Sequence, residues 1–279
     1  MQIIDCKKLA KEIQENVKEE IKTFNVRPGL AVLLVGEDEA SKIYIKLKEK
    51  ACSEAGIYFE KWEYAMDVEQ DTIINKIKEL DSRKEINGIL VQMPLPEKFD
   101  AQKIIESIDS QKDVDGFTPQ NIKNYLNSGK NYLISPLIQG IFEIIKSVNF
   151  DLNGKKICIL AKKSPFSDLL ERAFYNFSVK DVLVGDENIL SKIYTVDLVV
   201  VALGKEGILK SNMVKDGCFV VDVGINKNKE GKTVGDVDGE SFNAKSGWIT
   251  PVPGGVGPMT VAMLLKNVLD FYKEQNLSS

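Results

Sequence analysis

Apolar and polar residues alternate along the chain in a pattern that predicts helices and buried strands in turn. Between Leu9 and Ile21 an apolar residue recurs at every fourth position among Lys and Glu, which predicts a surface helix with one buried stripe. Residues 30–35 form a continuous apolar run, typical of a strand buried on both faces. Ser41 is the predicted cap of a helix that runs to about Ala55 and stops at Gly56.

The same rhythm continues to the end of the sequence. It predicts strands at 58–64 and 88–93, with helices at 71–80 and about 136–148. A second alternating unit begins near Asp151, with strands expected at 156–161, 181–184, 197–202 and 218–223 and a hairpin turn at 228–232. Strands that alternate with helices indicate an α/β protein with parallel sheets.

One stretch departs from this rhythm. Residues 249–260 hold three prolines and three glycines, and a helical pattern begins at Met259. Proline fixes φ and glycine allows close backbone approach, so the stretch reads as a shaped loop that leads into a helix N-terminus. Such a loop is a candidate anion or carbonyl site. The alternative is an elaborate turn without a ligand.

Length and charge exclude several classes of protein. A chain of 279 residues is long enough for two domains or one large α/β domain. The net charge of -4 comes from interspersed acidic and basic residues, which gives no basic surface for nucleic acid. No apolar run approaches a membrane span, and the start lacks the features of a signal peptide. We therefore expect a cytoplasmic protein without nucleic-acid or membrane partners.

The chain contains no histidine, which excludes catalysis by a histidine base and histidine-ligated metals. Any proton transfer must use Lys, Tyr, Cys or a carboxylate. The four cysteines are far apart in apolar or helical surroundings, so we expect reduced core thiols and no metal site; they are Cys6, Cys52, Cys158 and Cys218.

Three places carry side chains suited to chemistry. Tyr44 and Lys48 are four residues apart on one predicted helix face, where a phenol and an ammonium can share a site; a solvated lysine face is the alternative. Gln92 interrupts an apolar strand and is either a site residue or a satisfied core amide. Asp113 and Asp115 are one residue apart, so only one can face a given side, and an ordinary turn explains the motif equally well.

Several strings, taken together and in collinear order, resemble the bifunctional methylenetetrahydrofolate dehydrogenase/methenyltetrahydrofolate cyclohydrolase family. They span nearly the whole chain: Tyr44 with Lys48, then 91–96 (VQMPLP), 112–116 (KDVDG), 222–226 (DVGIN), 235–237 (GDV) and 251–260 (PVPGGVGPMT). The resemblance implies two α/β domains, a three-layer folate-binding catalytic domain at 1–135 plus 257–279 and a Rossmann-type NAD(P)-binding domain at 136–256. It also implies a cleft between them that holds folate, and a homodimer formed through the second domain.

The resemblance implies a role for individual residues. By position, Lys48 matches the family's catalytic lysine, Tyr44 the partner that stacks on the pterin, Gln92 the glutamine that hydrogen-bonds the lysine, and Asp115 the aspartate that binds the pterin. These four form the expected catalytic set. The expected substrate-binding residues also include Val91, Met93, Pro253, Gly254, Gly255, Val256 and Gly257. The expected cofactor-binding residues are Ala161, Lys162, Lys163, Gly204, Gly224, Ile225 and Thr260.

The implied activities are oxidation of 5,10-methylenetetrahydrofolate with NADP or NAD and hydrolysis of the methenyl product to 10-formyltetrahydrofolate. The cofactor half departs from the family: no glycine occurs between Gly154 and Gly185, and the string that helps to hold the adenosine phosphate has no counterpart. Asp186 and Glu187 stand there and would repel a 2′-phosphate. We expect weak use of NADP, NAD tolerated at least as well, and cyclohydrolase activity in excess of dehydrogenase activity.

Three other functions fit parts of the sequence. One is a cyclohydrolase that has lost efficient dehydrogenation, and another is a non-catalytic folate-binding dimer. Intact Lys48, Gln92 and Asp115 disfavour the non-catalytic reading, because a binder has no evident need for all three. A Rossmann dehydrogenase for a different substrate would leave the Pro/Gly loop unexplained.

Overall fold

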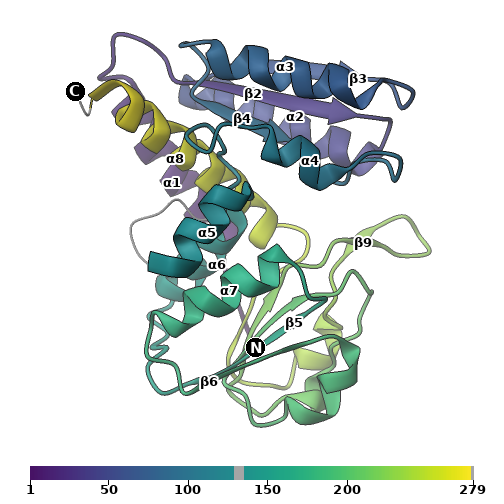
Figure 1. The fold of residues 1–279 in the computed structure, drawn as a ribbon. Helices are drawn as coiled ribbons and strands as arrows, with labels where there is room; N and C mark the ends of the chain where they lie inside the picture. Colours follow the sequence, from purple (N-terminus) through teal and green to yellow (C-terminus); the bar gives the residue numbers. More distant parts are fainter. Residues whose placement is uncertain (129–134, 278–279) are drawn as a thin grey trace. The chain divides into compact units, whose positions relative to one another are not determined.

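A computed structural model of the chain describes residues 1–128 and 135–277, which form two compact units. The three-stranded unit comprises residues 11–124, 135–136 and 261–277, and the six-stranded unit comprises 1–10, 125–128 and 137–260. Each unit has helices around a parallel sheet (Figure 1), so the predicted α/β class is confirmed.

The sheet of the three-stranded unit is built on its middle strand. Strand β2 (Gly29–Val35) lies between β3 (Tyr58–Tyr64) and β4 (Gly88–Val91), and both pairings are parallel. Every residue of β2 is buried, as its continuous apolar run predicts. A strand buried on both faces requires a helical layer on each side, and the unit has both.

The two layers of this unit take alternate side chains of β2. Leu30, Val32 and Leu34 pack in one core cluster with residues of α1 (Cys6–Ile21), α2 (Glu39–Ala55) and α8 (Val256–Leu277). Ala31, Leu33 and Val35 pack in the other with residues of α3 (Gln70–Ser82) and α4 (Ala101–Glu106). This alternation follows from the two-residue period of a strand. Helix α5 (Pro119–Ser128) follows α4 in the chain.

The sheet of the six-stranded unit is also entirely parallel. Its strand order is β1 (Gln2–Ile3), β11 (Trp248–Ile249), β8 (Phe219–Asp222), β7 (Leu198–Ala202), β5 (Lys156–Ala161) and β6 (Asp181–Gly185). Because β5 pairs with β6 on one side and with β7 on the other, the chain changes direction across the sheet at β5. That switch point is where doubly wound sheets bind nucleotides, beside the carboxyl ends of the strands.

The remaining elements of this unit cover or extend the sheet. They are α6 (Pro136–Ser147), α7 (Pro165–Tyr175), the 3₁₀ turns η1 (Glu187–Lys192), η2 (Ser211–Met213) and η3 (Gly239–Phe242), and the hairpin of β9 (Asn226–Lys227) with β10 (Thr233–Val234). The hairpin confirms the turn predicted at 228–232. One core cluster packs the side chains of Cys158, Val199 and Val220 against Phe242.

Several predicted element ends differ from the structure, three of them near the candidate site. Helix α2 begins one turn earlier than Ser41 implies, because the Asp38 carboxylate caps it by accepting from the Ser41 N–H at 2.7 Å. Strand β4 ends at Val91, before Gln92. Helix α8 begins at Val256, three residues before Met259. The predicted stop at Gly56 is confirmed, with φ of 85° in the left-handed region.

Candidate active site

Lys48 is a buried lysine on α2. Its side chain is 7% exposed, and Tyr44 lies one turn before it on the same helix. Burial lowers the pKa of Lys48, although the nearby charge of Asp115 opposes this shift. Burial also raises the pKa of the Tyr44 phenol, which therefore stays protonated near neutral pH. The alternative of a solvated lysine face is excluded for Lys48.

Gln92 is brought to Lys48 by the end of β4. Its backbone N–H still donates to Leu33 O at 2.8 Å, which continues the ladder one residue past the strand. Its side-chain Oε1 accepts from Lys48 Nζ at 2.8 Å, and its Nε2 donates to Met93 O at 2.8 Å. Because Met93 O takes the amide N–H₂, the amide oxygen is held toward the lysine. Gln92 is thus a partner of Lys48 and not an isolated core amide.

The two aspartates of the 112–116 string have different surroundings. Asp113 is 1% exposed and accepts from Gly116 N at 2.9 Å, Thr118 N at 2.7 Å and Asn121 Nδ2 at 3.0 Å, so it shapes the turn. Asp115 interacts electrostatically with Lys48. Burial raises the pKa of Asp115 to about 6, and the Lys48 charge opposes that rise. Asp113 therefore stabilises the turn, whereas Asp115 is the aspartate of this motif that interacts with Lys48.

Helix α8 contributes a residue that was not predicted to belong to the site. Asn267 is 1% exposed and its Nδ2 donates to Val114 O at 2.9 Å, directly beside Asp115. An asparagine within an apolar helix was the available indication, because a buried amide needs a partner. Its contact joins two segments far apart in the sequence.

The other expected folate-binding residues lie in two places. Val91 is the buried last residue of β4, and Met93 is 42% exposed beside Gln92. The loop residues Pro253, Gly254, Gly255, Val256 and Gly257 belong to the six-stranded unit. A Cβ on Gly255 would lie 2.3 Å from Pro251 O, and Gly254 has φ of 102°, so this loop turns too tightly for larger residues.

Six of the seven expected cofactor residues lie at or just after the carboxyl ends of β5, β7 and β8. Ala161 is the buried last residue of β5, and Lys162 and Lys163 follow it with exposed side chains. Ser164 then caps α7, with a reciprocal contact to Ser167. A helix N-terminus after the first strand of the switch point is the usual place for a pyrophosphate.

The remaining cofactor residues follow the neighbouring strands. Gly204 follows β7 with φ of 66°, and Gly224 and Ile225 follow β8, where the Ile225 side chain is 49% exposed. Thr260 lies in the first turns of α8, and its Oγ1 donates to Val256 O at 3.0 Å. Gly204, Gly224 and Ile225 therefore lie at the same edge of the sheet, beside the carboxyl ends of its strands.

The acidic pair after β6 is already engaged. Asp186 caps η1 by accepting from Asn188 N at 3.0 Å, and Glu187 pairs with Lys205 Nζ at 2.6 Å. The ion pair places a positive charge beside Glu187. The sequence alone did not indicate this pairing.

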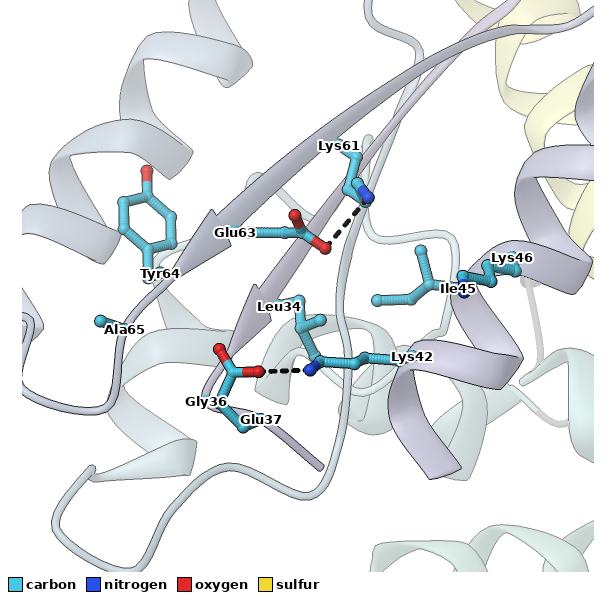
Figure 2. Close-up of a pocket in the computed structure, with 10 residues that line it drawn as sticks. All are labelled: Leu34, Gly36, Glu37, Lys42, Ile45, Lys46, Lys61, Glu63, Tyr64 and Ala65. Atoms are coloured by element: carbon cyan, nitrogen blue, oxygen red, sulfur yellow. Dashed lines mark hydrogen bonds and ion pairs between the residues drawn. The ribbon is translucent and has the colours of Figure 1, made fainter. Parts of the chain in front are cut away.

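A cavity of about 420 Å³ lies elsewhere in the three-stranded unit, between α2 and β3 (Figure 2). None of Tyr44, Lys48, Gln92 and Asp115 lines it. Its lining includes two ion pairs, Lys42 with Glu37 and Lys61 with Glu63 at 3.0 Å. Because the lining contains none of the four expected catalytic residues, we assign the cavity no part in catalysis.

The four cysteines are buried free thiols, and burial raises the pKa of each to about 12. They are therefore core residues, as predicted. Within residues 1–128 and 135–277, no group of acidic and cysteine side chains is arranged to hold a metal ion. No helix in that part of the chain is long and apolar enough to cross a membrane.

Comparison with known proteins identifies the family. Residues 4–115 match the profile described as tetrahydrofolate dehydrogenase/cyclohydrolase, catalytic domain, and residues 136–276 match the NAD(P)-binding domain of the same family. The chain is 43% identical to the bifunctional protein FolD of Hydrogenobaculum sp., over 99% of this chain and 100% of that protein.

Two solved structures have the same fold along their length. The bifunctional enzyme FolD of Campylobacter jejuni is 40% identical with a TM-score of 0.92, covering 98% of this chain and 99% of that one. The Trypanosoma brucei FolD, complexed with NADP cofactor and inhibitor, is 28% identical with a TM-score of 0.93, covering 100% and 99%.

These matches extend across both units and confirm the main functional prediction, a bifunctional dehydrogenase and cyclohydrolase, over the alternatives of a cyclohydrolase alone and a non-catalytic binder. Binding of a nicotinamide nucleotide is likewise supported at the level of NAD(P). The chain belongs to the tetrahydrofolate dehydrogenase/cyclohydrolase family.

Proposed function

We propose that Lys48, Gln92, Tyr44 and Asp115 form the folate site at which 5,10-methenyltetrahydrofolate is hydrolysed, after NAD(P)-dependent oxidation of 5,10-methylenetetrahydrofolate by the same protein. The observation that carries this assignment is the 2.8 Å contact from Lys48 Nζ to Gln92 Oε1, made by a lysine that is 7% exposed. A buried amine held by an amide oxygen suits proton transfer at a pH where a solvated lysine does not.

In the hydrolysis, a water oxygen bonds to the cationic methenyl carbon, which gives a hydroxylated carbon bridging N5 and N10. The bond from that carbon to N5 then breaks as N5 takes up a proton, the hydroxyl loses its proton to become the formyl C=O, and the formyl group stays on N10, with one proton released overall. A proton must leave the water as its oxygen attacks. Neutral Lys48 accepts it, and Gln92 Oε1 fixes the position of the amine. In the absence of histidine, Lys48 is the most suitable base in this group of residues.

Folate binding uses the residues around this pair. Asp115 accepts hydrogen bonds from pterin N–H groups. Its carboxylate is charged, and so best suited to accept them, at pH values above its pKa of about 6. Tyr44 stacks on the pterin, and Val91 and Met93 contact it from the end of β4. The loop at 253–257 completes the folate contacts. On this assignment the folate-binding domain is 1–135 plus 257–279 and the nucleotide-binding domain is 136–256, except that β1 pairs with β11 in the six-stranded sheet.

The nucleotide binds at the switch point of the six-stranded sheet, near Ala161, Lys162 and Lys163 and the N-terminus of α7. The exposed lysines supply point charges for phosphate, without the bidentate geometry of arginine. Because Asp186 and Glu187 stand after β6, NADP is used weakly, NAD at least as well, and hydrolysis exceeds oxidation.

Two further properties belong to the proposal. The protein works in the cytoplasm as a homodimer formed through the six-stranded unit. Support for the dimer comes from exposed aromatic rings at the end of α7, where Tyr175 is 46% and Phe177 47% exposed, and from β6, which lies at an edge of the sheet. Exposed edges and apolar side chains are features that partners cover.

Both half-reactions should be assayed on one preparation, with NADP and NAD at matched folate. We expect methenyl hydrolysis without nucleotide, and slower oxidation in which NAD matches or exceeds NADP. The variant Glu187→Gln should improve the kcat/KM for NADP several-fold, because it frees Lys205 and removes a negative charge. Glu206→Gln, which changes the neighbouring residue of Lys205, is the control. Efficient, strongly NADP-selective oxidation by the unchanged protein would contradict the proposed preference.

A further inference from the structure

Two buried aspartates lie at the carboxyl end of the six-stranded sheet, where the nucleotide is proposed to bind. Asp222 ends β8 and is 3% exposed, and Asp236 follows β10 and is completely buried. A buried carboxylate is costly unless its oxygens accept hydrogen bonds. The partners of these two side chains therefore reveal what they hold in place.

Asp236 binds the loop that follows β7. Its Oδ2 accepts from Leu203 N at 2.6 Å and Gly204 N at 2.9 Å, and its Oδ1 accepts from Lys205 N at 2.8 Å. Successive backbone N–H groups that converge in this way form a nest for an anion. Here the nest is filled by a side chain of the same protein, and Asn226 Nδ2 completes it at 2.8 Å from Oδ1.

Asp222 binds the segment that carries Asp236. Its Oδ1 accepts from Asp236 N at 3.0 Å and from Gly224 N at 2.9 Å, and its Oδ2 accepts from Val237 N at 3.0 Å. The two carboxylates therefore act in series. Asp222 holds the backbone of 236–237, and Asp236 reaches from that backbone to the loop after β7.

Two glycines are required by this arrangement. A Cβ on Gly224 would lie 2.2 Å from Asp236 Cγ, and a Cβ on Gly235 would lie 1.8 Å from Asp222 Oδ2. Each carboxylate thus lies directly against the backbone of the other segment. The arrangement gives a physical reason for glycine at these positions in the 222–226 and 235–237 strings.

We propose that Asp236 is a positioning residue for the nicotinamide nucleotide: its carboxylate fixes the backbone at Gly204 and, through Asn226, joins the loop after β7 to the segment after β8, where it lies against Gly224. The inference rests on the proposed function, which places the nucleotide at this edge of the sheet, and on the expectation from the sequence that Gly204 and Gly224 bind it. Asp236 does not touch the nucleotide in this arrangement. Because its carboxylate already fills the nest at 203–205, those N–H groups are not free for a phosphate, which must be held elsewhere.

The test is the variant Asp236→Asn, with Asp238→Asn as the matched control. An asparagine presents an N–H₂ group to donors that need an acceptor, so the loop after β7 must shift. Asp238 is two residues away and caps η3, where asparagine serves equally well. Methenyl hydrolysis needs no nucleotide, so its rate reports whether the folate site and the fold are intact.

We expect Asp236→Asn to raise the KM for the nucleotide by about tenfold or more while methenyl hydrolysis changes by less than about twofold. Asp238→Asn should leave both unchanged. A nucleotide KM that stays within about twofold of the unchanged protein's would overturn the inference, and so would an equal loss of both activities in a folded variant.

A milder variant covers the case in which Asp236→Asn does not fold. Asn226→Ala removes one donor to Asp236 and should raise the nucleotide KM about threefold, with little change in hydrolysis. An unchanged KM in this variant then decides against the inference. If the unchanged protein does not oxidise methylenetetrahydrofolate with either nucleotide, the proposed function is wrong. That result differs from an unchanged nucleotide KM in the variants, which would contradict only the inference about Asp236.

Discussion

At the scale of single residues, the proposed chemistry depends on one amine kept out of water. Among the described residues, Lys48 forms no ion pair within 4 Å, and its Nζ donates to the neutral amide oxygen of Gln92. Desolvation therefore dominates, and the pKa of the amine is lowered although Asp115 pulls it upward. The two influences set how much neutral lysine exists near neutral pH.

Replacing Lys48 with methionine should abolish methenyl hydrolysis. Methionine fills a similar volume in the buried position but cannot accept a proton, so the fold and folate binding should be largely kept. Stopped-flow or steady-state loss of the methenyl absorbance measures the rate. The control is Lys46→Met, which changes an exposed lysine of the same helix. Normal hydrolysis by a folded Lys48→Met protein would remove the proposed mechanism.

Replacing Asp115 with asparagine should move the pH profile of hydrolysis to lower pH. The Asp115 charge raises the pKa of Lys48, so its removal lets the amine lose its proton at lower pH. The quantity to follow is kcat at saturating folate, because the same change weakens pterin binding. Glu49→Gln removes an exposed carboxylate next to Lys48 in sequence, where solvent screens the charge, and should leave the profile in place. A shift to higher pH would contradict the assignment.

At the scale of elements, α2 positions both Tyr44 and Lys48, and its first turn depends on Asp38. The Asp38 carboxylate accepts from Ser41 N at 2.7 Å, whereas the Ser41 hydroxyl lies beside the same carboxylate and has a 3.5 Å contact to Met93 O. The capping role therefore belongs to Asp38.

Asp38→Ala should lower the free energy of unfolding by about 1 kcal/mol, the typical cost of a lost N-cap. Ser41→Ala should cost clearly less. Urea denaturation of both variants, followed by far-ultraviolet circular dichroism, compares them under the same conditions. A larger loss in Ser41→Ala would return the capping role to the serine.

The elements also show which features a sequence can reveal. The apolar run 30–35 predicted a buried strand because each of its residues is apolar, and β2 spans Gly29–Val35. Strands β1 and β11 were not predicted, because two residues show no period. The cap was misplaced because Asp38 and Ser41 are both good capping residues within one turn.

The candidate site likewise has one part that the sequence could predict and another part that it could not. Spacing alone placed Tyr44 and Lys48 on one face of a helix, but the partner of Lys48 is 44 positions away, at the end of a strand. No local pattern indicates such a contact, so Gln92 and Asp115 were only candidates from the residues themselves, and their roles beside Lys48 came from the family resemblance. No role was predicted for Asp236 itself, because its role depends on contacts among three segments that lie far apart in the sequence and that the sheet brings together. The cleft between the domains stays a prediction.

At the scale of the whole molecule, the proposed homodimer is open to a direct test. Tyr175→Lys places a charge among the exposed rings at the end of α7, so dimerisation should weaken by about tenfold or more. Sedimentation equilibrium measures the dissociation constant. Ile43→Lys, at a side chain that is 52% exposed in the three-stranded unit, is the control. Equal dissociation constants for both variants and the unchanged protein would place the contact elsewhere.

The two units differ in when their cores become complete during synthesis on the ribosome. The core on one face of β2 includes Val261, Leu264, Leu265, Val268, Leu269 and Phe271, which are made near the end of translation. The sheet of the six-stranded unit needs only residues up to β11, because β1 has already been made. The nucleotide-binding unit can therefore finish its sheet first, while the unit that carries Lys48 waits for α8 with apolar surface exposed, a state in which a nascent chain depends on chaperones.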